Sequence, residues 1–234
     1  MEVGLGYLVT GGRDSPHHVL MPAVVTLSGR LVRLEPLSLA AIDDLVAAAC
    51  EDRSTYAFTR VPNSRDEMAS YVETVLAEQA QGRAVPYAIR WLNTDRIVGA
   101  TRLMNLEYWQ GPLLWSPGSL REVGESPSVA DIGYTWLSVS AQGTGVNRES
   151  KFLMLSHAFE TWNVHRITLK ADARNERSRA AILALGAHFD GVRRAESRGA
   201  DDTVRDTAFY SILNAEWPAI RERLYTRLGY AEAA

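Results

Sequence analysis

The chain has 234 residues, of which 46% are hydrophobic, so it can form the core of one large domain or two small ones. Its 25 Lys and Arg residues and 28 Asp and Glu residues give a formal net charge of −3. It therefore lacks the basic surface that drives bulk nucleic-acid binding, and we expect no nucleic-acid partner. The single cysteine, Cys50, excludes an internal disulfide framework, and its alanine-rich surroundings predict a buried side chain.

No stretch of the sequence reaches the roughly 18 apolar residues that a membrane-spanning helix needs. The first residues carry no Lys or Arg before Arg13 and are interrupted by several glycines, which is a poor match to a signal peptide. We therefore expect an N-terminal tail over 1–24 and a single domain over 25–234. We also expect a cytoplasmic location and no membrane partner.

The predicted elements begin with a strand around 31–34 and two helices, over about 39–51 and 65–81. A β-hairpin follows, with strands in 85–92 and 96–106. Residues 107–129 contain three prolines and no regular pattern, which predicts a long irregular connection. Its aromatic stretch from Tyr108 to Trp115 is interpreted either as lining for an acceptor pocket or as a dimer contact.

The second half continues with a strand over 130–139, a glycine-rich loop over 141–147, a helix near 148–162, a strand over 165–171 and a helix near 175–185. Two strands over 187–196 and 203–214 flank a charged turn, and a last helix begins at Glu216-Trp217-Pro218. The order contains no internal repeat and no Ser/Pro-rich linker. It predicts a single α/β domain with a mixed sheet.

The glycine-rich loop, AQGTGVN, joins a strand to a helix. A loop of this kind is typical of an anion site, because backbone N–H groups at a helix N-terminus face phosphate oxygens. It is not a P-loop, since no Gly-Lys-Ser/Thr closes it, and the third glycine of a Rossmann fingerprint would fall at Arg148. Taken alone, the loop is equally compatible with a tight turn that binds nothing.

A second motif follows the next strand: KADARNERSRAAILALG contains a strand end, an Asn, a short helix and a terminal Gly. The two motifs together, Q-x-x-G before one helix and N-x-x-S before a helix ending in L-G, resemble the GNAT superfamily of acyl-CoA N-acyltransferases. More narrowly they resemble its Rim-like branch of ribosomal-protein alanine N-acetyltransferases. The resemblance covers about 31–228. It implies a mostly antiparallel central sheet, flanked by helices, with splayed central strands.

The resemblance implies acetyl-CoA as co-substrate and no metal. The residues expected to hold its pyrophosphate are Gln142, Gly143, Thr144, Gly145, Val146 and Asn147. The family usually has Gly or Ala where Asn147 stands. Gly133 is the candidate for a bulge that splays the strands, and Trp136 and Leu137 match positions whose backbone pairs with pantetheine. Asn175 is expected to contact coenzyme A, to cap the following helix, or both.

Many relatives carry a tyrosine acid at the position of Ile182, so this chain lacks it. The Rim-like branch points instead to the hydroxyl of Ser178, whose alternative role is helix capping. The candidates for the base are Asp131, Tyr134 with an ordered water, and Glu107. We expect His157 and His165 to be surface or packing residues and not catalysts.

The leading hypothesis is an N-acetyltransferase that passes the acyl group directly to a primary amine in a ternary complex. The acceptor is a protein N-terminus, a lysine or a small amine, and the resemblance alone slightly favours a peptide or protein. The missing tyrosine keeps one alternative open, a catalytically silent acyl-CoA-binding sensor or interaction module. The sequence leaves open the acyl-chain preference and whether the chain forms a homodimer.

Overall fold

The computed structural model describes residues 22–109 and 126–230. Most of the expected tail over 1–24, and the centre of the expected connection over 107–129, lie outside these residues. Within the described ranges, every helix is too short or too polar to cross a bilayer.

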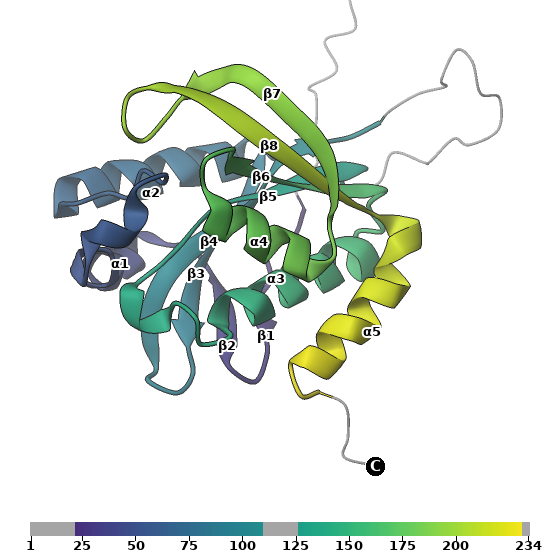
Figure 1. The fold of residues 1–234 in the computed structure, drawn as a ribbon. Helices are drawn as coiled ribbons and strands as arrows, with labels where there is room; N and C mark the ends of the chain where they lie inside the picture. The colour runs from purple at the N-terminus through teal and green to yellow at the C-terminus, as the bar shows by residue number, and fades with distance from the viewer. Residues whose placement is uncertain (1–21, 110–125, 231–234) are drawn as a thin grey trace, which may run out of the picture.

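An eight-stranded sheet in the order β1-β2-β3-β4-β5-β6-β8-β7 forms the centre of the molecule (Figure 1). Its strands are β1 (Leu27–Ser28), β2 (Val32–Pro36), β3 (Ala84–Trp91), β4 (Arg96–Glu107), β5 (Val129–Leu137), β6 (Arg166–Asp172), β7 (His188–Arg198) and β8 (Val204–Leu213). All neighbouring strands are antiparallel except β5 and β6, which are parallel. The expected mixed, mostly antiparallel sheet is confirmed.

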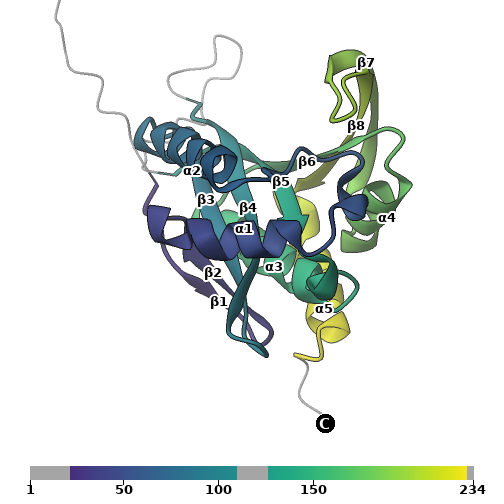
Figure 2. The same cartoon turned by 90° about the vertical axis from the view of Figure 1, so that its left-hand side faces the viewer.

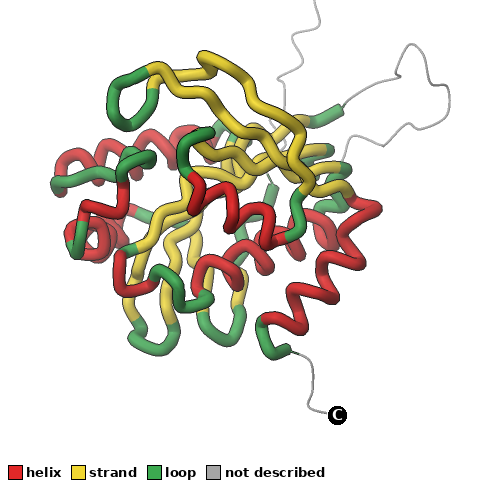
Figure 3. The backbone as a smooth tube through the Cα atoms, viewed as in Figure 1, coloured by secondary structure: helices red, strands yellow, loops and turns green. Residues whose placement is uncertain are grey.

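Helices cover both faces of the sheet, as the views in Figures 2 and 3 show. One face carries α1 (Ile42–Cys50) and α2 (Arg65–Ala80), and the other carries α3 (Val146–Ser156), α4 (Glu176–Leu185) and α5 (Trp217–Arg227). A π-helical turn, His157–Thr161, continues α3. Short 3-10 turns are η1 (Leu39–Ala41), η2 (Arg53–Tyr56), η3 (Val139–Ala141) and η5 (Asn214–Glu216).

Two hydrophobic cores lie on the two sides of the sheet. Strand side chains alternate between them, so that Leu103 and Ile132 pack toward α3 whereas Ala100 and Trp136 pack toward α1 and α2. The sheet therefore presents one defined face to each helix layer. We refer below to the α3 face and the α2 face.

The predicted order of helices and strands is confirmed, and the structure differs from the prediction in two details. The short strand β1 was not expected, and it pairs with β2 through Leu27 and Leu34. The prediction that Cys50 is buried is wrong: Cys50 is the last residue of α1, where its exposed side chain faces the backbone of Asn63. Local alanine content does not show which face of a helix end meets the core.

Candidate functional site

The parallel strands β5 and β6 pair over only part of their length. Pairing joins residues 129–132 to residues 166–169, although β5 continues to Leu137 and β6 to Asp172. Beyond the last pair the facing backbone groups of the two strands have no partner in the ladder. The expected splayed strands are confirmed, and the gap between them suits an extended ligand that pairs like an added strand.

A β-bulge interrupts β5 beside this gap. The register against β4 shifts by one residue after Gly133, so Thr101 of β4 faces both Tyr134 and Thr135. Tyr134 adopts a φ of +49°, an uncommon conformation for a residue with a side chain. We expected Gly133 to be the bulge residue, but Gly133 keeps its pair with Arg102 and the bulge falls on the next two residues.

The backbone of β5 presents alternate residues to the gap. Ser138 donates its N–H to the Val98 carbonyl at 2.7 Å, which marks a hydrogen-bonded pair with β4. Because such pairs alternate along an antiparallel ladder, Trp136 is directed toward Ala100 of β4 and Leu137 toward the gap. Of the two residues expected to pair with pantetheine, Leu137 is therefore the better placed.

Gln142 ties three segments together at the end of β5. Its Nε2 donates to the Leu137 carbonyl at 3.0 Å and to Thr55 Oγ1 at 3.1 Å, and its Oε1 accepts from Arg177 at 2.9 Å. The Tyr56 hydroxyl donates to the same Leu137 carbonyl at 2.9 Å. The Gln142 side chain thus holds the loop in shape. Of the two backbone groups of Leu137, the carbonyl is engaged within the protein and the N–H remains for a ligand.

The glycine-rich loop turns sharply into α3. Gly143 and Gly145 have φ values of +75° and +98°, and Gly145 is the N-cap of the helix. Thr144 stabilises the turn by donating its hydroxyl to the Ala141 carbonyl at 2.7 Å, and Val146 anchors the helix start in the core. N–H groups in the first turn of a helix have no partner inside it, and the helix dipole favours an anion there.

Two further residues belong to the first turn of α3, directly after the loop. The Asn147 Oδ1 atom is buried and has no hydrogen-bond partner among the described residues. Arg148 forms no ion pair or hydrogen bond with another described residue. Sequence reasoning treated Arg148 only as a mismatch to a glycine fingerprint, whereas a cation directly after a glycine loop is itself a signal for phosphate.

The gap and the loop together fit an acyl-CoA molecule. The gap offers unpaired backbone groups to a pantetheine chain, the loop offers N–H groups to a pyrophosphate, and Arg148 offers positive charge. The orphaned Asn147 Oδ1 is an acceptor, so a donor group of the ligand, and not a pyrophosphate oxygen, would satisfy it.

The second motif forms the start of α4, directly after β6. Asn175 is the N-cap, and its Oδ1 accepts the backbone N–H of Ser178 at 3.0 Å. The capping role left open for Asn175 is therefore present. The Ser178 hydroxyl makes no hydrogen bond to another described residue, and Ile182 is buried in the core one turn further along.

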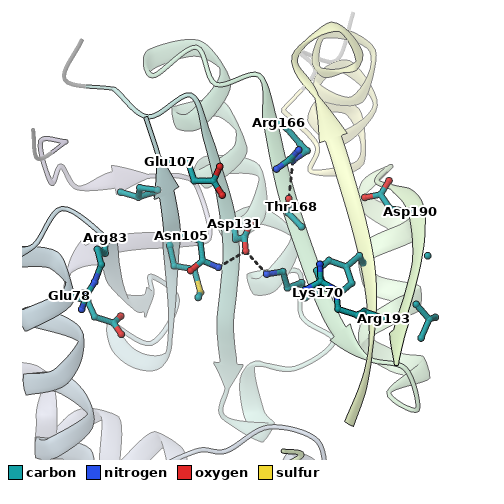
Figure 4. Close-up of a pocket in the computed structure, with 15 residues that line it drawn as sticks. Glu78, Arg83, Asn105, Glu107, Asp131, Arg166, Thr168, Lys170, Asp190 and Arg193 are labelled. Atoms are coloured by element: carbon teal, nitrogen blue, oxygen red, sulfur yellow. Dashed lines mark hydrogen bonds and ion pairs between the residues drawn. The ribbon is translucent and has the colours of Figure 1, made fainter. Parts of the chain in front are cut away.

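A cavity of about 910 Å³ lies on the α2 face, over β4, β5, β6 and the β7–β8 hairpin (Figure 4). Its charged lining residues are Glu78, Arg83, Glu107, Asp131, Arg166, Lys170, Asp190 and Arg193. Both signs are equally represented. The cavity therefore has no overall electrostatic preference for an anion or a cation.

Asp131, a candidate for the base, is tightly engaged in this cavity. Its Oδ2 accepts from Asn105 Nδ2 at 2.7 Å and lies 2.8 Å from Lys170 Nζ. Both contacts hold the carboxylate against neighbouring side chains of the sheet. Asp131 also lies where β5 and β6 are still paired, before the bulge. Its geometry argues against a role as the base, and Glu107 lies still further from the bulge along the sheet.

A second cavity, of about 730 Å³, lies over the bulge itself. It is lined by Tyr134, Tyr56, Tyr71, the segment between α1 and α2, and the tip of the β7–β8 hairpin. Tyr134 is 54% exposed here. An acceptor entering this cavity would therefore approach the bulge from the α2 face.

Sequence reasoning missed two residues that hold Tyr134. The Arg102 guanidinium lies 3.8 Å from the centroid of the Tyr134 ring, and Glu78 of α2 pairs with Arg102 at 2.9 Å. Both are separated from Tyr134 in the sequence and meet it only through the register of the sheet.

The two histidines have packing roles. His157 is buried edge-to-face against Trp162, and burial lowers its pKa. His165 stacks on Trp109 at 5.2 Å. Neither histidine lines either cavity.

Comparison with known proteins agrees with this geometry. A family model described as an acetyltransferase (GNAT) domain matches residues 31–188. YdaF of Bacillus subtilis (strain 168), named as a ribosomal N-acetyltransferase, is 28% identical over 99 residues, 42% of this chain and 53% of YdaF. The match thus spans about half the length of that relative.

Solved structures extend the similarity over most of the chain. A protein from T. thermophilus, described as an acetyltransferase, is 32% identical, with 87% of this chain and 96% of that chain covered and a TM-score of 0.68. RimJ of Mycobacterium smegmatis, solved with CoA-disulfide, is 21% identical, with 90% and 98% covered and a TM-score of 0.71.

Proposed function

The chain belongs to the GNAT acetyltransferase family, and from this premise we propose that it transfers the acetyl group of acetyl-CoA directly to the N-terminal amine of a peptide or protein. The observation that carries the proposal is the gap between β5 and β6, which has a bulge in the middle and a glycine-rich loop at its end. When bound, acetyl-CoA supplies an activated acetyl thioester.

The chain contributes binding groups along the gap. The register of β5 against β4 directs the N–H of Leu137 into it, and we assign the first turn of α3, which includes Arg148, to the pyrophosphate. Gly143 and Gly145 let the backbone approach the phosphates without a side chain in between.

Two hydroxyl groups are our candidates for the proton transfers. Ser178 stands at the start of α4 with an unengaged hydroxyl, and we assign it the proton donated to the departing thiolate. Tyr134 faces the cavity over the bulge, and we assign its hydroxyl, with an ordered water, the relay that passes the proton leaving the amine to solvent, from which Ser178 is reprotonated. Asn175 positions Ser178 by capping the helix.

Replacing Ser178 with alanine should lower kcat about 100-fold or more, because general acid catalysis contributes on that order. The Asn175 cap should survive, since it accepts from the backbone N–H of residue 178, which alanine retains. Steady-state kinetics with acetyl-CoA and a peptide, together with the affinity for coenzyme A, measure both effects. A wild-type kcat in Ser178→Ala would remove Ser178 from the mechanism.

Two observations support a peptide acceptor. One cavity lies over the bulge, and a larger cavity on the same face of the sheet is lined by charges of both signs, which suits a chain carrying varied side chains. Relatives are named as ribosomal N-acetyltransferase and RimJ.

The acceptor is tested with matched peptides at one pH near 7.5. One peptide has a free N-terminus and no lysine, and the second has a blocked N-terminus and one lysine. A small polyamine is the third acceptor. An α-amine, with a pKa of about 8 against about 10.4 for lysine, is more often uncharged and should give the highest kcat/KM. A higher value for the polyamine would reassign the acceptor to small amines.

A further inference from the structure

A lysine is buried on the α3 face, directly beneath the bulge. Lys151, on the second turn of α3, is 6% exposed. Its Nζ donates to Thr101 Oγ1 of β4 at 3.2 Å and makes a short hydrogen bond with Thr135 Oγ1 of β5. The two hydroxyls also bond each other at 2.7 Å. The three groups form a closed triangle across the two strands.

The triangle spans the place where the backbone is irregular. Thr101 is the residue that faces both Tyr134 and Thr135, and Tyr134 has the positive φ. Such a conformation persists in a residue with a side chain only when the surroundings hold it. On the α2 face Arg102 packs on the Tyr134 ring, and on the α3 face Lys151 holds Thr135.

We propose that Lys151 is a positioning residue that fixes the β5 bulge in its reactive geometry from the face opposite the acceptor. The inference rests on the proposed function, because the bulge matters for catalysis only if the acetyl thioester lies beside it. Lys151 touches neither cavity and acts through Thr135. Without it, the bulge can relax by exchanging the orientations of Tyr134 and Thr135.

The amine is isolated from other charges. The groups that face it are Thr101 from β4, Thr135 from β5 and, beside Thr101, Met154 from α3 itself, and none of these is charged. Burial lowers the pKa of Lys151 to about 7, and no charged side chain among the described residues contributes to that shift. An uncharged amine can both donate to and accept from the two hydroxyls, so it completes the triangle.

The test replaces Lys151 with methionine, which keeps the length of the side chain and removes the amine. The Thr101 and Thr135 hydroxyls still bond each other, so no buried polar group is left without a partner. We expect kcat for acetyl transfer to fall about 10- to 100-fold, as for a small misplacement of reacting groups, while the affinity for coenzyme A is unchanged.

A double-mutant cycle separates positioning from a general loss of structure. Thr135→Val should also lower kcat, and the double variant Thr135→Val/Lys151→Met should lose no more than the more impaired of the two single variants. Ser150→Ala is the matched control: Ser150 is buried next to Lys151, but its hydroxyl donates within the helix, to the Val146 carbonyl at 2.8 Å. It should keep the wild-type kcat.

The melting temperature of Lys151→Met separates a positioning role from a structural one. Loss of a stabilising contact would lower it, whereas removal of a buried amine that costs stability should raise it. The pKa of Lys151 is about 7 in the folded protein and near 10.5 in the unfolded chain. Below pH 7 the Lys151 amine is charged in both the folded and the unfolded state, so folding carries the full cost of burying the charge. Between pH 7 and 10.5 the unfolded chain binds more protons than the folded protein, so the destabilisation caused by Lys151 falls as pH rises. Lys151→Met should therefore melt higher than wild type at pH 6, by a margin that shrinks at pH 9.

Each outcome has a distinct meaning. A wild-type kcat in Lys151→Met, or a double variant whose loss is the product of the two single losses, would overturn the role of Lys151. A lower melting temperature together with weaker coenzyme A binding would make Lys151 a structural residue. If the wild-type protein itself acetylated no amine, the proposed function would fail independently of Lys151.

Discussion

Replacing Gly145 with valine is expected to abolish coenzyme A binding, with a loss of affinity of about 100-fold or more. Gly145 has a φ of +98°, a conformation that a β-branched residue adopts only with strain. A Cβ at this position would lie 3.2 Å from Leu31 Cδ1, so the Leu31 side chain or the loop must also move slightly. The N–H groups that we assign to the pyrophosphate would then lose their geometry. The thermal shift produced by coenzyme A measures the effect.

Gly229→Val is the matched control for this strain. Gly229 has a φ of +70° with open space around its Cα, and it lies after α5, outside the loop. Its replacement introduces the same backbone penalty without touching the anion site. Gly229→Val should retain the full thermal shift. A full shift in Gly145→Val would show that the loop does not bind the phosphates.

Replacing Glu149 with alanine is expected to destabilise the fold by about 4 kcal/mol, because it leaves several buried and half-buried donors without an acceptor. Glu149, on α3, is 1% exposed and accepts the backbone N–H groups of Arg30, Leu31 and Val32 at 3.0, 2.7 and 2.6 Å. The Tyr230 hydroxyl also donates to it in a short hydrogen bond. This loss is a large fraction of the stability of an ordinary domain. Urea denaturation measures it.

Glu176→Ala provides the comparison for a carboxylate in the first turn of a helix. Glu176 is exposed at the start of α4 and interacts mainly with the helix dipole, so its loss should cost no more than about 1 kcal/mol. Equal stability losses in the two variants would contradict the structural role of Glu149.

The helices and strands were predictable where local signals mark them, namely capping residues, turn residues and alternating apolar positions. Helix α2 begins at Arg65 in both the prediction and the structure, and Ser64 caps it by accepting the N–H of Glu67. The splayed strands followed from the resemblance and are confirmed by the short parallel pairing of β5 with β6. Asn175 was placed correctly at a cap because capping depends on local sequence.

Features that depend on contacts between distant segments were not predictable. The bulge falls one residue beyond Gly133, since its position depends on the register of β5 against β4. Asp131 looked available at a strand start, but Lys170 on the neighbouring strand occupies it. Lys151 and Glu149 read as ordinary polar residues of an amphipathic helix. Only packing against the sheet shows that both are buried.

Direct acetyl transfer to a peptide N-terminus is tested by the stoichiometry of the reaction. Wild-type protein is incubated with acetyl-CoA and the peptide bearing a free N-terminus, and released thiol and acetylated peptide are quantified together with the mass of the protein. The predicted result is one thiol released per acetylated N-terminus, with no acetyl group retained by the protein. Tight coenzyme A binding without acetylation of any amine tested would contradict the proposed transfer and favour an acyl-CoA-binding sensor.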